Sequence, residues 1–222
     1  MAEATMHRLI WLFFDAPPSV ASIESLHSEF PDAGAMYIAR CDEHSEQAQM
    51  WTRNPTQKMP LARVAMDIER DDIEWQSVIR LAADMNAEAH WCRGPSPIPP
   101  ALMIGETFPG TLQLCCFERA QGLSDRALEQ IWFHEHAPVA VATQNTVGYR
   151  QNLVLRSSHD PLDGIVEELF PITAADSLTA FFADGDDEEK MLAHINVLTK
   201  SSERVLNLEK SSVIHMTERR LR

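Results

Sequence analysis

The sequence has few cysteines and no long hydrophobic run. Its four cysteines, at positions 41, 92, 115 and 116, form no C-x-x-C pair, and the last two are adjacent. This pattern provides no disulfide framework and predicts reduced thiols in a soluble, cytoplasmic protein. The chain does not open with a basic segment followed by an apolar core, and it has no apolar stretch of membrane-spanning length. Neither a signal peptide nor a membrane span is therefore predicted.

Positive charge is also scarce. There are 19 Lys and Arg residues against 33 Asp and Glu, which gives a formal net charge of −14. So acidic a surface repels phosphate backbones and anionic lipids unless it carries a concentrated basic patch. The only basic cluster is Arg219, Arg220 and Arg222 near the end of the sequence. We therefore expect no nucleic-acid partner and no membrane partner.

Several motifs that hold cofactors or metals are missing as well. The sequence contains no G-x-G-x-x-G, no G-x-x-x-x-G-K-[ST], no G-x-S-x-G and no H-E-x-x-H. His134 and His136 have a spacing that would suit metal ligands on a strand. On a helix, however, residues two apart point in nearly opposite directions. Because their segment has a helical pattern, the sequence predicts no metal site and no cofactor.

The hydrophobic fraction of 45% is enough for a real core, and its pattern divides the first hundred residues into short elements. Strands are predicted over 7–14, 35–41 and 61–69, and helices over 19–30 and 71–85. The polar stretch 42–60 predicts a long excursion. The proline-rich segment 94–100 cannot form a helix or an inner strand, so it predicts a domain linker with a broken fourth strand around it.

The second half repeats this order with clearer signals. Strands are predicted over 111–118, 148–155, 163–170 and 205–215, a helix capped by Ser124 over 125–142, and further helical segments with a break near Asp184 and Gly185. Each half thus has the order strand–helix–strand–strand–helix–strand, which is the split βαβ pattern. The predicted fold is α+β: tandem ferredoxin-like units, over residues 1–100 and 101–222, whose sheets pack together as an α+β barrel.

The helix over 125–142 is the most informative segment. Trp132 and His136 are four residues apart and share one face. Pro138 has no amide hydrogen and crowds the carbonyl of His134, which predicts a kink beside the imidazole of His136. Such a place suits a small polar substrate. Two interpretations stay open for His136: a general acid or base, or a histidine stabilised by the C-terminal end of its helix.

The run GLSDRALEQIWFHEHAP resembles the EthD family in its G-L-S helix start, its tryptophan and its His-Ala-Pro. The likeness continues in the segments 148–152 (GYRQN, a compressed form of the family's strand) and 163–167 (DGIVE). It covers about residues 111–216. The first half matches in element order alone, and we interpret it as a degenerate copy without a site of its own.

The resemblance implies an α+β barrel of the superfamily that includes cofactor-independent cyclases, isomerases and small monooxygenases. It also implies a site, with catalytic roles for His136, Tyr149 and Glu167 and substrate contacts from Trp132, His134, Gln151 and Asp163. Judged from the residues alone, Asp163 and Glu167 could equally lie on a strand edge facing water, and Trp132 could belong to the core.

We therefore expect a small-molecule enzyme that uses no cofactor. The expected reaction is a lyase step such as decarboxylation, dehydration or carbon–carbon cleavage; an isomerase, cyclase or cofactor-free monooxygenase comes second. Its substrate would be largely apolar, aromatic or polyketide-like. The alternative is a non-catalytic accessory or ligand-binding barrel of a degradation pathway, and haem or metal use, which occurs elsewhere in the superfamily, is a third hypothesis. Homodimerisation is left open.

Overall fold

A computed structural model describes residues 6–69, 72–159, 161–182 and 187–222. Eight strands close into one barrel in the order β1-β3-β2-β8-β5-β7-β6-β4, and all neighbours are antiparallel. The prediction that strands and helices combine in a barrel is confirmed. The strands are β1 (Met6–Phe13), β2 (Met36–Arg40), β3 (Ala62–Ile68), β4 (Glu88–Gly94), β5 (Gly110–Arg119), β6 (Gly148–Ser157), β7 (Gly164–Pro171) and β8 (Leu206–Arg220).

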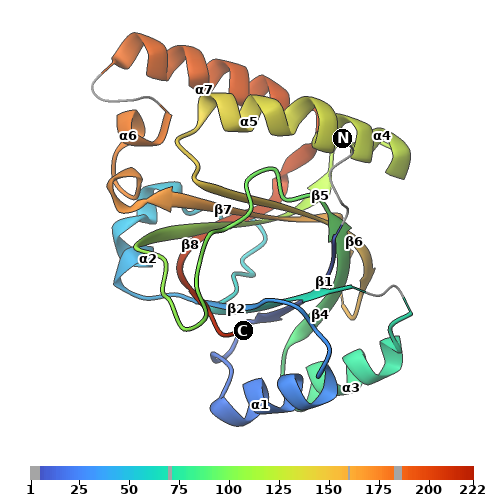
Figure 1. The fold of residues 1–222 in the computed structure, drawn as a ribbon. Helices are drawn as coiled ribbons and strands as arrows, with labels where there is room; N and C mark the ends of the chain where they lie inside the picture. The colour runs from blue at the N-terminus through green and yellow to red at the C-terminus, as the bar shows by residue number, and fades with distance from the viewer. Residues whose placement is uncertain (1–5, 70–71, 160, 183–186) are drawn as a thin grey trace.

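Helices cover two opposite sides of the barrel. Figure 1 shows α1 and α3 on one side and α4, α5 and α7 on the other. None of the helices in the described ranges has the length and apolar character needed to cross a lipid bilayer. The helical elements are α1 (Val20–Glu29), α2 (Glu43–Gln47), η1 (Gln49–Trp51), α3 (Trp75–Asp84), α4 (Asp125–Glu129), η2 (Gln130–His136), α5 (Ala137–Thr143), η3 (Ile172–Ala174), α6 (Leu178–Phe182) and α7 (Glu188–Ser202).

The two halves of the chain contribute four consecutive strands each. The first half has the order β4-β1-β3-β2 and the second the order β6-β7-β5-β8. Hydrogen bonding between β2 and β8, and between β4 and β6, joins the two halves into one wall. The boundary predicted at residue 100 lies in the connection from β4 to β5. The fourth strand of the first half ends at Gly94, where the proline-rich segment begins.

Several local expectations can be compared directly with the structure. Ser124 accepts a hydrogen bond from the backbone N–H of Ala127 at 3.2 Å, which confirms it as the cap of α4. The predicted excursion over 42–60 contains the short helices α2 and η1. The helix break predicted at Asp184 and Gly185 lies outside the described residues.

The helix that carries His136 contains a π-helical segment that the sequence pattern did not predict. In η2 the N–H of Ala137 bonds to the carbonyl of Trp132, five residues back. Pro138 then falls in the first turn of α5, where a missing N–H leaves no hydrogen bond unmade. The wider turn therefore accommodates the proline and places His136 at the junction of η2 and α5. Single π-turns of this kind are frequent at functional sites.

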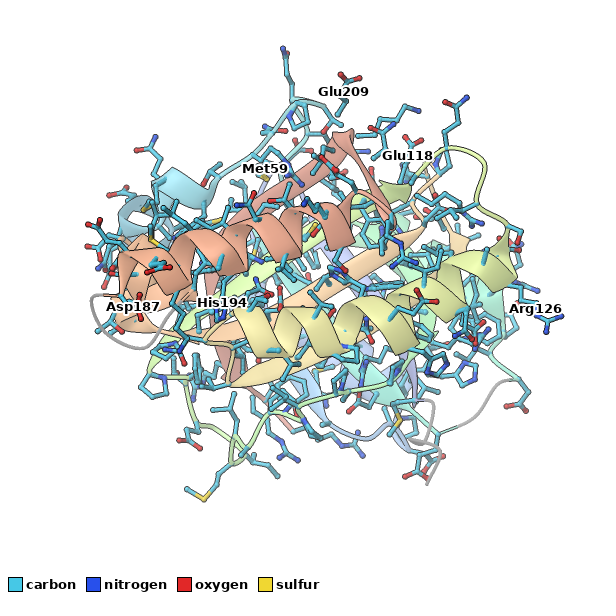
Figure 2. All side chains as sticks on the ribbon, turned by 90° about the horizontal axis from the view of Figure 1, so that it is seen from above. Met59, Glu118, Arg126, Asp187, His194 and Glu209 are labelled. Carbon is cyan, nitrogen blue, oxygen red and sulfur yellow. The ribbon has the colours of Figure 1, made fainter. Side chains whose placement is uncertain are left out.

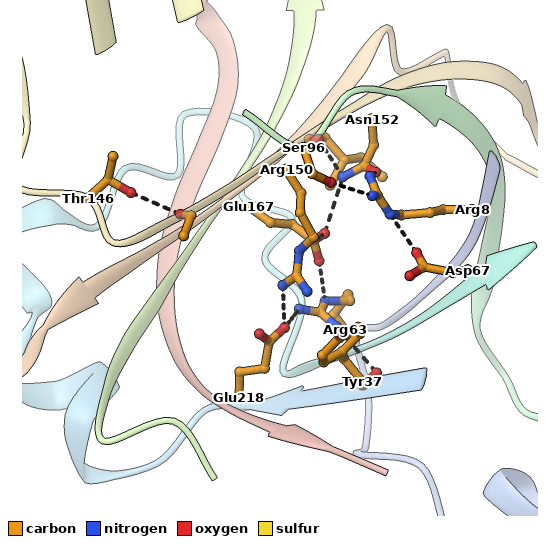
Figure 3. A network of polar contacts seen from close by, with 12 residues as sticks. Arg8, Tyr37, Arg63, Asp67, Ser96, Thr146, Arg150, Asn152, Glu167 and Glu218 are labelled. Carbon is orange, nitrogen blue, oxygen red and sulfur yellow. Dashed lines mark hydrogen bonds and ion pairs between the residues drawn. The ribbon is translucent and has the colours of Figure 1, made fainter. Parts of the chain in front are cut away.

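Charged side chains are buried inside the barrel as a ring of four. Arg63 Nε lies 2.7 Å from Glu167, Arg150 Nε lies 3.0 Å from Glu167, and both guanidinium groups also contact Glu218. All four side chains are at most 3% exposed. Each charge in the ring has two opposite charges beside it (Figure 3). This arrangement offsets much of the desolvation penalty that an isolated buried ion would incur.

The ring extends toward β1 through polar contacts. Asn152 Nδ2 donates to Glu167 at 3.2 Å, and Asn152 Oδ1 accepts from Arg8 Nη1 at 2.9 Å. Arg8 also donates to Asp67 at 2.8 Å and to Ser96 at 2.6 Å. Five strands, β1, β3, β6, β7 and β8, are therefore connected through side chains across the barrel interior.

We expect Glu218→Gln to destabilise the fold strongly. The change removes one carboxylate of the ring and leaves two buried arginines facing a single glutamate. Breaking a buried ion pair in this way costs about 3–5 kcal/mol of unfolding free energy. Urea denaturation at pH 7 measures this loss. Arg80→Gln is the matched control, because its contact with Glu74 lies on the surface and its loss should leave stability nearly unchanged. Equal losses in the two variants would contradict the structural role of the ring.

Candidate functional site

A cavity of about 220 Å³ lies between the outer face of the sheet and the helical segments η2, α6 and α7. Viewed from above in Figure 2, α5 and α7 run side by side over this part of the sheet. Apolar side chains form most of its wall, and a few polar groups converge on it. Its polar and aromatic lining residues include Trp51, Arg53, Gln113, His136, Tyr149 and Glu168.

His136 is 8% exposed and lines this cavity. Its Nδ1 lies 2.9 Å from the hydroxyl oxygen of Ser201 on α7, which fixes the ring orientation. Burial, with a smaller contribution from Arg204, lowers the pKa of His136 to about 4. The imidazole is therefore neutral at pH 7. When Nδ1–H donates to Ser201, the lone pair of Nε2 is available to accept a proton.

Glu168 is the carboxyl group of the cavity. It is buried, and burial raises its pKa to about 8, although the amide of Gln113 favours the ionised form by donating at 3.2 Å. The other oxygen, Oε1, has no hydrogen-bond partner among the described residues. At pH 7 the side chain is mostly protonated, so a proton donor and a proton acceptor line the same cavity.

A short polar chain holds Gln113 in place behind Glu168. The carbonyl oxygen of the Gln113 side chain lies 3.3 Å from Nε2 of His215, and Nδ1 of His215 lies 3.1 Å from the hydroxyl of Thr111. Burial lowers the pKa of His215 to about 4, so this histidine is neutral. The contacts position the Gln113 amide so that its N–H group points at Glu168.

Tyr149 lines the cavity as well and is almost fully buried. Gln151 lies behind it, and its side-chain amide donates both to Tyr149 Oη and to the carbonyl of Trp132, each at 3.1 Å. Burial raises the pKa of Tyr149 well above its ordinary value of 10. The phenol is protonated at pH 7 and can donate a hydrogen bond.

The structure brings His136 and Tyr149 together and places other predicted site residues elsewhere. Glu167 faces the barrel interior, on the opposite side of the sheet from the cavity, because successive strand residues alternate between faces. Asp163 pairs with Arg119, whose Nε lies 2.7 Å away. The expectation that Glu167 or Asp163 shares a cavity with the imidazole is therefore corrected.

Two further residues from the predicted set also lie outside the cavity lining. His134 is exposed on the helix surface, as the argument from helical rotation implies. Trp132 is fully buried and packs edge-to-face on Phe117, with ring centroids 4.9 Å apart. Trp132 therefore belongs to the core between helix and sheet, which was the alternative interpretation of this residue.

The first half of the chain also contributes to the cavity. Trp51 stacks on Phe181 with ring centroids 4.2 Å apart, and its indole N–H donates to the carbonyl of Ala174 at 3.0 Å. Arg53 pairs with Val213 of β8 through backbone hydrogen bonds. No motif in the polar stretch 42–60 indicated this role, because the contacts depend on how that excursion folds back onto the other half.

Thiol and metal chemistry can be assessed from the same geometry. Cys115 lines the cavity, and burial raises its pKa to about 12, so the thiol is protonated at pH 7 and is a weak nucleophile. Within the described part of the chain, no group of three or more His, Cys, Asp or Glu side chains is arranged to hold a metal ion.

Neither a scan against protein-family models nor a search of curated proteins finds a match for this chain. A search of solved structures finds an anthrone oxidase-like protein at a TM-score of 0.50 and 9% identity, over 99% of this chain and 94% of that one. It also finds a chlorite dismutase-like protein at a TM-score of 0.42 and 14% identity, over 99% and 96% of the two chains. At 9% identity, the likeness to the anthrone oxidase-like protein shows a shared fold and does not extend to the site.

Proposed function

We propose that the cavity lined by η2, α6 and α7 is the active site of a cofactor-independent enzyme that moves protons on a small aromatic or polyketide-like molecule. The reaction would be a lyase or isomerase step. One observation carries the proposal: a neutral imidazole and a protonated carboxyl group line the same mainly apolar cavity. Such a pair can remove a proton at one point and supply one at another without a cofactor.

His136 would act as the general base. Its ring is held by Ser201 at Nδ1, so Nε2 is the nitrogen that can accept a proton from the substrate. Burial makes the neutral form dominant at pH 7, although it also makes the imidazole a weaker base in the ground state. A developing negative charge on the substrate would stabilise the imidazolium that forms, because opposite charges attract more strongly beside apolar walls than in bulk water.

Glu168 and Tyr149 would stabilise the enolate or phenolate produced by proton removal. A carboxylic acid kept protonated at pH 7 by an apolar site can donate a hydrogen bond to such an oxyanion. The unpartnered Oε1 of Glu168 and the Tyr149 hydroxyl are the groups suited to this role. The catalytic carboxyl group of this proposal is therefore Glu168, whereas the resemblance implied a catalytic role for its neighbour Glu167.

The resemblance to the EthD family supports the same location. The residues that carry it include the cap at Ser124 and the His-Ala-Pro at 136–138, and these frame the helix above the cavity. The element order and strand order of each half fit two split βαβ units joined in one chain. We interpret the barrel as a tandem α+β barrel of that superfamily, with the site in the second unit.

A non-catalytic ligand-binding barrel is the second candidate. It is favoured by the way the protein already occupies two of the polar groups, since Ser201 contacts His136 and Gln151 contacts Tyr149. A binding protein would take up the same molecules but leave their protons unexchanged. Proton exchange therefore separates the two functions, whichever later bond is made or broken.

We expect the protein to accelerate deuterium exchange at the enolisable carbon of 1-tetralone, a two-ring aromatic ketone. In D₂O at pH 7 the exchange is followed by proton NMR. His136→Ala should lower the protein-dependent rate by about 100-fold or more, the usual range for loss of a general base.

His134→Ala is the matched control for this experiment. It removes an imidazole from the same helix but from its exposed side, so the rate should be unchanged. If His136→Ala remained folded and exchanged deuterium as fast as the wild-type protein, the assignment of the base would be wrong. Ligand binding with no exchange in any variant would favour the binding-barrel function.

The exchange rate should also have a plateau bounded by two pKa values. The base is active only while His136 is neutral, so the rate falls as pH decreases through about 4. The acid is active only while Glu168 is protonated, so the rate falls again as pH increases through about 8. Glu168→Gln should abolish the alkaline limb and keep the acidic one. An alkaline limb that persists in this variant would exclude Glu168 as its source.

A further inference from the structure

A second cavity, of about 360 Å³, opens at one end of the barrel, and we call it the barrel-mouth cavity. Its volume lies at the lower end of the range for small-molecule sites. Its wall includes the end of β1, the starts of β4 and β8, and the end of β5. Its lining residues include Leu12, Phe14, His90, Cys116, Lys210 and Glu118.

This cavity is separate from the one beneath the helices. Cys116 lines the barrel-mouth cavity, whereas its neighbour Cys115 lines the other, because adjacent residues of β5 face opposite sides of the sheet. Leu12 and Cys116 also belong to the apolar cluster inside the barrel, which forms the floor of the barrel-mouth cavity. An apolar ring system would bury its surface against this floor.

His90 is the polar group of the floor. It lies opposite Ile10, an inward-facing residue of β1, and is 1% exposed. Neither of its ring nitrogens has a hydrogen-bond partner among the described residues. Leaving such a buried group unsatisfied costs about 1–3 kcal/mol, so its presence at a cavity wall needs an explanation.

The hydrogen-bonding capacity of His90 indicates what would satisfy it. Burial, with Lys58 and His159, lowers its pKa to about 3, so the ring is neutral and offers one N–H donor and one acceptor nitrogen. A hydroxyl group can bond to either nitrogen, because it donates to the unprotonated nitrogen and accepts from the N–H. A carboxylate can only accept, and a hydrocarbon can do neither.

The charges at the rim are balanced. Lys58 lies 2.5 Å from Glu88, and Lys210 lies 2.7 Å from Glu118, so each ammonium group has a carboxylate beside it. Figure 2 shows Glu118 on the same edge of the molecule as Met59 and Glu209, the sequence neighbours of the two lysines. With two positive and two negative charges, the rim does not select for an ionised ligand.

We propose that the barrel-mouth cavity binds an uncharged, hydroxyl-bearing aromatic molecule of the phenol class. The rings lie against Leu12, Phe14 and Cys116, and the hydroxyl bonds to His90. This site goes beyond the proposed active site, since it uses the other face of the sheet and none of the same side chains.

Three probes of similar shape test the ligand class: 2-naphthol, naphthalene and 2-naphthoate. Isothermal titration calorimetry at pH 7 measures their dissociation constants with the full chain. We expect 2-naphthol to bind at least tenfold more tightly than either of the others, which corresponds to about 1.4 kcal/mol and one hydrogen bond. Equal affinities for 2-naphthol and naphthalene, or no binding of 2-naphthol, would overturn the proposal.

Variants then locate the site. His90→Leu should weaken 2-naphthol binding at least tenfold and remain folded, because it replaces an unsatisfied polar group by an apolar one. His90→Gln keeps one donor and one acceptor and should bind more tightly than His90→Leu. His134→Ala changes an exposed imidazole that lines neither cavity, and it should bind 2-naphthol as the wild type does. An affinity that is unchanged in His90→Leu would overturn this site without bearing on proton exchange in the other cavity.

Discussion

Two arginines and two glutamates are buried together in the barrel, and the strand arrangement depends on their pairing. Arg63 comes from the first half of the chain, and Arg150, Glu167 and Glu218 come from the second. A slip of one residue along any of these strands would turn its charged side chain to the outer face and leave opposite charges unpaired inside. The ring therefore restricts the register in which the two halves can close into a barrel.

The alternation of strand residues gives adjacent side chains different environments. Burial opposes ionisation of both Glu167 and Glu168. For Glu167, Arg150 and Arg63 outweigh it and lower the pKa, whereas Glu168 has no such cation among its influences and its pKa rises to about 8. Two successive glutamates thus serve as a structural anion on one face and a protonated acid on the other. The two cysteines of β5 are divided between the two cavities in the same way.

Much of the fold could be predicted because hydrophobic periodicity and turn residues act locally. The strand and helix order of the second half, the cap at Ser124 and the barrel class follow from such signals. The site was only partly predictable. Around Glu167 and Glu168, apolar residues occupy both alternating sets of strand positions. The pattern therefore does not tell which of the two glutamates faces the helices. The contributions of Trp51 and Ser201 depend on contacts between distant segments, which no local pattern encodes.

Burial without an opposite charge is the common property of the groups that can exchange protons or bind ligands here. The arginines of the interior lie beside the carboxylates and balance their charge, although Nη1 of Arg150 and Oε1 of Glu218 have no hydrogen-bond partner among the described residues. Among the residues that the structure describes, no opposite charge pairs with His136, Glu168 or His90, and each is therefore held in its uncharged form by desolvation. An uncharged polar group at an apolar cavity wall recovers its lost hydrogen bonds only from a ligand of matching polarity. The same desolvation that raises or lowers these pKa values therefore also selects apolar molecules with one or two polar groups.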